Sequence, residues 1–277
     1  MPVRIKSILS MLLASASFAG MTLCVSMGCS RLPALESAFI RGLADSLFVL
    51  PILLFQKVKI PGKHWKELLL RGTIGTAGLF CIFNSLLMIP VAEATALFRS
   101  TALFVPFVAR VFIKERIKPA RIILAAVGFL GVLLILKPGH HSFSIGGIIA
   151  LIGAILNALV FVTIRHLSER ENPFLIAFAF FSSSAFYSLI IAGHTFIMPV
   201  GQEWFYLALV SLFGFIGQYF LTVAFALAPA SVIAPWSYFE IVFSAVFGVI
   251  FLSQQPDAFS IIGTAILALS AILITRS

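Results

Sequence analysis

Long stretches of apolar residues, separated by short polar connections, recur along the whole chain. A helix rises 1.5 Å per residue, so about 20 apolar residues cross the roughly 30 Å hydrocarbon core of a membrane. The apolar stretches between charged positions or Pro and Gly breaks predict ten transmembrane helices. The predicted spans are 6–28, 35–55, 72–90, 92–113, 121–137, 144–164, 173–197, 204–227, 231–252 and 259–275.

The composition favours the same interpretation. Of the 277 residues, 61% are hydrophobic and 10% are charged, whereas about 25% are charged in ordinary soluble domains. Ten spans use about 200 residues and leave only short loops, with no room for a soluble catalytic domain. We therefore predict an all-α integral membrane protein that contacts the lipid bilayer and needs no cofactor.

The first span begins like a secretory signal peptide, because Arg4 and Lys6 precede an apolar run that contains Ala14-Ser15-Ala16. The run is longer than the core of a typical signal peptide, and a second span follows it directly. We therefore predict an uncleaved first helix.

Basic residues are distributed unequally between the predicted loops. With the N-terminus in the cytoplasm, 14 of the 19 Lys and Arg residues lie on the cytoplasmic side, and only Arg31 and Lys137 lie in outer loops. Such asymmetry sets membrane orientation, so we predict a multi-pass protein of the cell inner membrane with both termini cytoplasmic. The net charge of +9 then reflects topology and does not indicate a nucleic-acid partner. The 14 residues are Arg4, Lys6, Lys57, Lys59, Lys63, Lys66, Arg71, Lys114, Arg116, Lys118, Arg121, Arg165, Arg170 and Arg276.

The two halves of the chain are weakly similar. A shift of 139 residues aligns Pro90-Val91-Ala92 with Pro229-Ala230-Ser231. Each half contains five predicted spans, and because this number is odd the second half enters the membrane in the opposite sense. The pattern predicts two repeats, 1–138 and 142–277, in a 5+5 inverted arrangement. Inverted repeats are common in secondary transporters, whose binding sites lie near the membrane midplane between the repeats.

Two stretches carry a resemblance to a known family. They are Pro90 to Pro138, PVAEATALFRSTALFVPFVARVFIKERIKPARIILAAVGFLGVLLILKP, and Ala228 to Gly263, APASVIAPWSYFEIVFSAVFGVIFLSQQPDAFSIIG. The second span adds Phe39-Ile40-Arg41. On these residues the chain resembles the drug/metabolite transporter superfamily, EamA type, over nearly its whole length. The resemblance implies a transporter of a small organic metabolite and no enzymatic activity.

The second stretch also resembles one branch of that family, through Pro235, Tyr238, Glu240 and Pro256-Asp257. That branch includes the S-adenosylmethionine uptake carriers of obligate intracellular bacteria, so the resemblance implies S-adenosylmethionine as the first candidate substrate. Gln254 departs from the family pattern, which usually has an acidic residue there. Related branches export amino acids and other metabolites, and such export is the alternative.

Five charged residues lie inside predicted spans, where each costs several kcal/mol unless it faces a partner or a wet cavity. Arg41 and Asp45 are four residues apart and share a helix face, which predicts a local structural ion pair. Arg110 lies about one turn from the inner end of its span and can extend to the headgroups. Arg99 and Glu240 occupy nearly equivalent positions in the two halves, near mid-depth.

We predict that Arg99 and Glu240 face one cavity and bind the substrate. Arg99 is expected to take a carboxylate and Glu240 an ammonium or sulfonium, while Trp236 or Tyr238 takes a ring or a cation. A permanent salt bridge without substrate contact is the alternative. Apolar, aromatic and a few polar groups typically line small-molecule sites. The other predicted lining residues are Phe80, Asn84, Asn157, Phe161 and Gln218.

Two other classes of function fit the sequence less well than transport. An intramembrane enzyme needs a nucleophile or paired acids beside a base, and no such set stands out. The adjacent His140 and His141 have no further metal ligand near them in sequence, so no metal site is predicted. A non-transporting scaffold leaves Arg99 and Glu240 without a use. The sequence favours a carrier that works by alternating access, as a monomer and without ATP hydrolysis.

Overall fold

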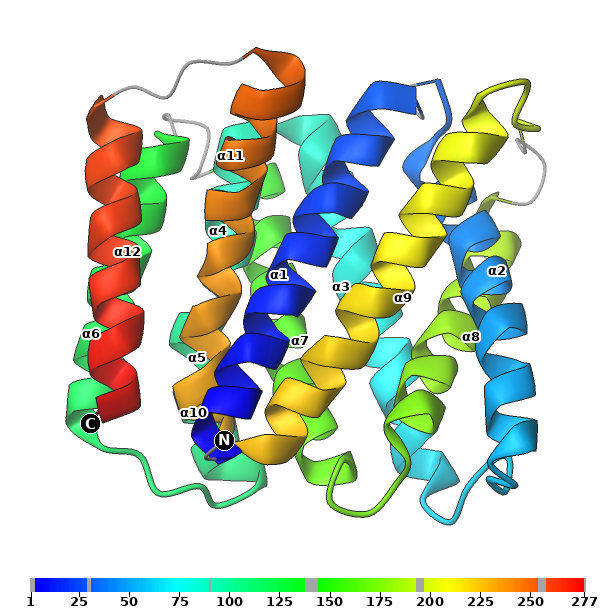
Figure 1. Cartoon of the computed structure of the whole chain (residues 1–277), viewed down its shortest axis with the longest axis horizontal. Coiled ribbons are helices and arrows are strands. Elements are labelled where there is room, and N and C mark those ends of the chain that lie inside the picture. Colours follow the sequence, from blue (N-terminus) through cyan, green and yellow to red (C-terminus); the bar gives the residue numbers. More distant parts are fainter. Residues whose placement is uncertain are drawn as a thin grey trace.

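The computed structural model describes residues 3–28, 31–89, 91–137, 144–192, 197–253 and 258–276. The predictions made at His140, His141, Gln254 and Pro256-Asp257 lie outside these residues. All the elements assigned in these ranges are helices, and the long helices and the stacked shorter ones lie side by side across the same thickness (Figure 1). They are α1 (Val3–Gly28), α2 (Ala34–Phe55), α3 (Trp65–Met88), α4 (Val91–Arg99), α5 (Thr101–Phe112), α6 (Pro119–Leu136), α7 (Ile145–Leu167), α8 (Pro173–Ala192), α9 (Glu203–Leu227), α10 (Ala230–Ile233), the 3-10 helix η2 (Ala234–Tyr238), α11 (Phe239–Leu252) and α12 (Ala258–Arg276).

Ten spans account for these helices. Within the described ranges, nine segments are long and apolar enough to cross a membrane, and α12 contributes a shorter apolar segment, Ile261–Arg276. The segment Glu93–Phe112 joins α4 to α5, and Ala230–Phe251 joins α10, η2 and α11. The predicted all-helical membrane fold with ten spans is thus confirmed.

One predicted boundary differs in a way that matters for the site. The third span was predicted from residue 72, whereas α3 begins at Trp65. Hydropathy marks only the apolar part of a helix, and α3 also contains Lys66, Glu67 and Arg71. Arg71, placed with the cytoplasmic loop residues by its charge, therefore lies inside a transmembrane helix.

Contacts between helices follow the internal repeat. α1 packs mainly on α9 and α3 mainly on α7, while α2 packs on α8 and α6 packs on α12. Exchanging the halves converts the α1–α9 contact into the α7–α3 contact and leaves the other two pairs unchanged. These contacts have the symmetry of a 5+5 inverted repeat. Both chain termini lie at one end of the bundle, as an even number of spans requires (Figure 1).

The fourth and ninth spans, predicted as continuous helices, are interrupted near their middle. Ser100 separates α4 from α5, and its N–H donates to the Leu97 carbonyl at 3.1 Å while its own carbonyl accepts from the Leu103 N–H at 2.8 Å. This spacing of three residues marks a tighter turn than the α-helix. In the ninth span, η2 contains Pro235, which lacks the N–H that a helix interior needs. The two breaks occupy corresponding places in the two halves.

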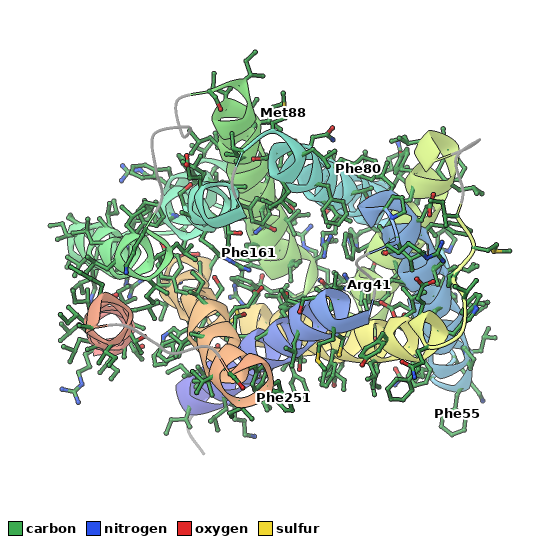
Figure 2. The ribbon with its side chains drawn as sticks, turned by 90° about the horizontal axis from the view of Figure 1, so that it is seen from above. Arg41, Phe55, Phe80, Met88, Phe161 and Phe251 are labelled. Carbon is green, nitrogen blue, oxygen red and sulfur yellow. The ribbon has the colours of Figure 1, made fainter. Side chains whose placement is uncertain are left out.

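The outer surface and the interior of the bundle differ in chemistry. Figure 2 shows Phe55, Met88 and Phe251 directed away from the bundle, whereas Arg41 and Phe161 lie inside it. Large apolar side chains are exposed on most spans. In lipid this apolar surface is the favourable one, so the charged and polar groups that point inward mark the place to search for a site.

Candidate substrate-binding site

A cavity lies between the two halves of the chain. Its deep part has a volume of about 180 Å³ and is lined by residues of α1, α2, α3, α4, α7, α8, α9, η2 and α11. A wider part of about 580 Å³ shares several lining residues with it and extends to Val25 and Leu32, where α1 ends and α2 begins. We call this the outer end of the bundle, and we call the end that holds both chain termini the inner end. The cavity thus reaches the outer end.

Arg99 and Glu240 meet in the region that both parts of the cavity share. Nη2 of Arg99 donates to Oε1 of Glu240, and 20% and 13% of the two side chains are exposed. Arg99 is the last residue of α4 and Glu240 the second of α11, so each lies beside the break of its own span. The ion pair therefore joins the two halves at their interruptions, where opposite charges can be held near mid-depth.

Arg41 has two environments. Its Nε lies 3.3 Å from Oδ2 of the buried Asp45, so the predicted local pair is present. The Arg41 side chain also lines both parts of the cavity. It reaches them beside Gly214, where an added Cβ would lie 2.4 Å from Nε of Arg41. Arg41 thus also faces the central cavity, which the prediction of a purely local pair did not include.

Arg71 is a cavity residue that the sequence prediction missed. Only 1% of it is exposed, and it lines the deep part of the cavity from α3. Its guanidinium lies over the Phe180 ring, 4.8 Å from the ring centroid. Gly75, four residues later and so on the same helix face, was the available sequence signal, because a glycine leaves room beside a helix for a long side chain. In the structure an added Cβ at Gly75 would lie 2.5 Å from Nη1 of Arg71.

Three of the predicted lining residues do line the deep part of the cavity: Asn157, Phe161 and Gln218. Nδ2 of Asn157 donates to Oγ1 of Thr101 at 3.4 Å, which links α7 to α5. Nε2 of the buried Gln218 has no hydrogen-bond partner among the described residues. This amide can therefore donate to a bound molecule.

Comparison with known proteins supplies the family. The model of the EamA-like transporter family matches residues 5–137 and residues 144–276. The chain belongs to this family. The two matches fall one on each half of the bundle.

The chain is similar to several transporters of the EamA-like family over most of its length. It is 32% identical to the pseudopaline exporter CntI of Pseudomonas aeruginosa over 98% of this chain and 96% of that protein. It is 29% identical to an S-adenosylmethionine uptake transporter of Rickettsia felis, over 90% of this chain and 85% of that protein. A solved crystal structure has the same fold, with a TM-score of 0.85, 19% identity and coverage of 99% and 97%. The chain is therefore a multi-pass membrane protein of a family of small-molecule transporters.

Two aromatic residues predicted for the site of this EamA-family chain lie elsewhere. Trp236 of η2 donates from Nε1 to Oγ1 of Thr275 at 3.1 Å and stacks on Phe239 with 5.4 Å between ring centroids, so its ring packs against α12 and the start of α11. Tyr238 is buried, with its ring 6.5 Å from that of Phe129 on α6. The tight turns of η2 rotate both rings away from the cavity, whereas a continuous helix was expected there.

Phe80 and Asn84 also lie away from the cavity walls. Asn84 is exposed, and its Nδ2 donates to the Phe80 carbonyl at 2.8 Å. The two residues share a face of α3, because they are four apart. The cavity face of α3 instead carries Arg71, Gly75 and Leu79, which follow one another at intervals of four residues.

Proposed function

We propose that this EamA-family chain is a secondary transporter that carries a small metabolite with an amino acid end group across the inner membrane by alternating access. The Arg99–Glu240 pair is the observation that carries the proposal. It bridges the two halves inside the cavity. A substrate carboxylate can replace Glu240 on Arg99, and an ammonium or sulfonium can replace Arg99 on Glu240. When a zwitterion binds, the Arg99–Glu240 ion pair is therefore replaced by two ion pairs with the substrate, and the charges of Arg99 and Glu240 both stay neutralised.

S-adenosylmethionine uptake is the more specific form of this proposal, which the sequence resemblance suggested and the named function of the Rickettsia felis relative supports. Outward transport of an amino acid or related metabolite is the second candidate, and it is favoured by the similarity to a protein named as an exporter. Both forms use the same pair of charges. The site contributes no catalytic step in either.

The shape of the cavity fits one stage of an alternating-access cycle. The cavity reaches the outer end of the bundle, while its deep lining ends near Met11 and Ser237 on the inner side. With the termini in the cytoplasm, as the basic residues predict, this stage faces the exterior. The breaks in the fourth and ninth spans supply points about which the two halves can reorient.

Transport by vesicles that contain the purified protein tests the proposal. The probes are labelled S-adenosylmethionine and a panel of labelled amino acids, measured in both directions. Glu240→Gln keeps the size of the side chain but removes its charge, so we expect transport to fall by about tenfold or more. Glu169→Gln is the matched control, because Glu169 is exposed at the inner end and does not line the cavity. Unchanged transport by Glu240→Gln would exclude the proposed role of the pair.

The double variant separates binding from a permanent salt bridge. If the bridge is only structural, Arg99→Gln and Glu240→Gln each leave an uncompensated charge and lower the melting temperature, while the double variant restores both stability and transport. If the pair binds substrate, the double variant recovers stability but remains inactive. Melting temperature and transport measured on the same preparations distinguish the two cases.

A further inference from the structure

We propose that Arg71 binds a second anionic group of the substrate in the deep part of the cavity. The substrate class is then a metabolite that carries an additional carboxylate, or an equivalent anion, besides its amino acid end group. This inference rests on the proposed transport function and adds the charge of its substrate.

The state of the Arg71 side chain is the first observation. It is fully buried inside α3, yet its Nε and Nη1 have no hydrogen-bond partner in the part of the chain that the structure describes. An uncompensated charge inside a membrane costs several kcal/mol, so such residues face partners or functional cavities. The Phe180 ring attracts the cation but offers no acceptor for its N–H groups. A carboxylate provides both the charge and two acceptor oxygens.

The surroundings of Arg71 hold its guanidinium in place. Phe180 of α8 lies on one side of it, and the bare backbone of Gly75 lies on another. Any side chain at Gly75 would collide with Nη1, since even a Cβ would lie 2.5 Å from it. An arginine fixed in this way is prepared for bidentate recognition of a carboxylate. Both Arg71 and Gly75 line the same deep cavity as Arg99 and Glu240, so one substrate can contact them together.

The charges around the cavity give the sign of the substrate. The residues that line the deep part include three arginines and one glutamate, which are Arg41, Arg71, Arg99 and Glu240. Asp45 pairs with Arg41, and Glu240 pairs with Arg99. Arg71 therefore adds one positive charge that neither of these acids neutralises. An additional carboxylate balances it, whereas the sulfonium of S-adenosylmethionine adds to the excess. Within the transport proposal, Arg71 therefore favours acidic metabolites over S-adenosylmethionine, the substrate that the sequence resemblance suggested.

Binding of two probes of equal size tests this charge rule. L-glutamate and L-glutamine differ by one side-chain carboxylate, and their affinities for the purified protein can be measured by calorimetry or ligand-dependent melting. We expect the wild-type protein to prefer L-glutamate by about tenfold or more, as a charge-assisted hydrogen bond provides, and Arg71→Gln to lose this preference. Arg110→Gln, at an exposed arginine of α5, should retain it. Absence of the preference in the wild-type protein, or its survival in Arg71→Gln, would overturn the inference.

A pair of glycine substitutions on α3 tests the same site without removing a charge. Gly75→Ala pushes the Arg71 guanidinium out of place and should reduce the preference for L-glutamate. Gly78→Ala is the matched control, because its added Cβ would have no neighbour nearer than 3.6 Å. Alanine favours helices over glycine, so neither variant is expected to unfold α3. Equal preferences in the two variants would count against an oriented Arg71.

The failure of this inference and the failure of the transport proposal give different results. If Glu240→Gln abolishes transport and Arg71→Gln leaves the preference unchanged, the transport proposal stands and the second anion site falls. If Glu240→Gln transports normally, the proposed role of the Arg99–Glu240 pair is excluded, whatever binding preference the Arg71→Gln variant shows.

Discussion

At the inner end of the bundle the two halves of the chain are joined through partly or fully buried hydrogen bonds, whereas at the outer end they separate around the wide part of the cavity. The inner contacts centre on Glu115, which follows α5. Its carboxylate accepts from the N–H groups of Ala230 at 3.1 Å and Ser231 at 3.2 Å, and from the Ser231 hydroxyl. Ser7 of α1 adds a hydrogen bond to the Ala224 carbonyl at 2.8 Å.

The outer end has a connection of a different kind. Arg31 and Glu203 form a two-pronged ion pair at 2.8 and 2.7 Å, which links the α1–α2 connection to the start of α9. The Arg31 side chain is 47% exposed, so water competes for this pair. At the inner end, by contrast, a carboxylate caps the first N–H groups of α10, where the helix dipole favours negative charge. The comparison shows that, among the described residues, the two halves are joined by partly or fully buried hydrogen bonds at the inner end, whereas at the outer end an exposed ion pair lies beside the wide part of the cavity.

The largest expected effect is a contrast in access between the two ends. In a background with the native cysteines Cys24, Cys29 and Cys81 replaced by serine, Thr22→Cys should react with a membrane-impermeant thiol reagent added to the outer side. Thr22 is exposed and lines the wide part of the cavity. Val232→Cys should not react from either side, because Val232 is buried in α10. As a control, both cysteine variants should be labelled after denaturation. Equal labelling of the two folded variants would contradict the predicted difference in access between the two ends.

A smaller effect is expected when the inner contact is weakened. Glu115→Ala removes the acceptor for two backbone N–H groups and a hydroxyl, each contact to a charged group contributing roughly 1.5 to 3 kcal/mol. We expect the inner end to open more often, so that Val232→Cys becomes reactive from the inner side by about tenfold or more. The rate of thiol labelling in inside-out vesicles measures this.

Glu169→Ala provides the comparison for Glu115→Ala. Glu169 is exposed at the inner end and pairs with Arg165 at 2.7 Å within α7 and the turn that follows it. Its loss should leave the labelling rate near that of the parent protein. A similar gain in both variants would indicate general loosening and not an inner closing contact.

The smallest effect is expected at the outer ion pair. Arg31→Gln should lower the free energy of unfolding by about 1 kcal/mol or less, because exposed pairs are weak. The difference from the wild-type protein should shrink as salt is added, since salt screens exposed charges. Melting temperatures at low and high salt measure it. A loss as large as that of Glu115→Ala would show that the outer end is held as firmly as the inner end.

Much of the fold could be predicted from the sequence, because each transmembrane segment has to be apolar and long enough to cross the hydrocarbon core, whatever its neighbours are. Apolar length gave the ten spans, and the odd number of spans in each half gave the inverted repeat. The cytoplasmic position of the termini and the repeat limits at 138 and 142 stay predictions. The site was partly accessible by the same reasoning, since the cost of a charge in lipid singled out Arg99, Glu240 and Arg41.

The remaining features depended on which way each side chain turns, and hydropathy contains no such information. The charged start of α3 concealed Arg71 among loop residues. The interruption at η2 rotated Trp236 and Tyr238 into packing contacts with α12 and α6, while Nε2 of Gln218 has no hydrogen-bond partner among the described residues. The sequence by itself determined how many helices cross the membrane and which charges need a partner, because transfer into lipid acts on each segment separately. Only the tertiary structure decided which partners meet and that Nε and Nη1 of Arg71 have no partner among the described residues, because these contacts depend on how the helices pack and where they break.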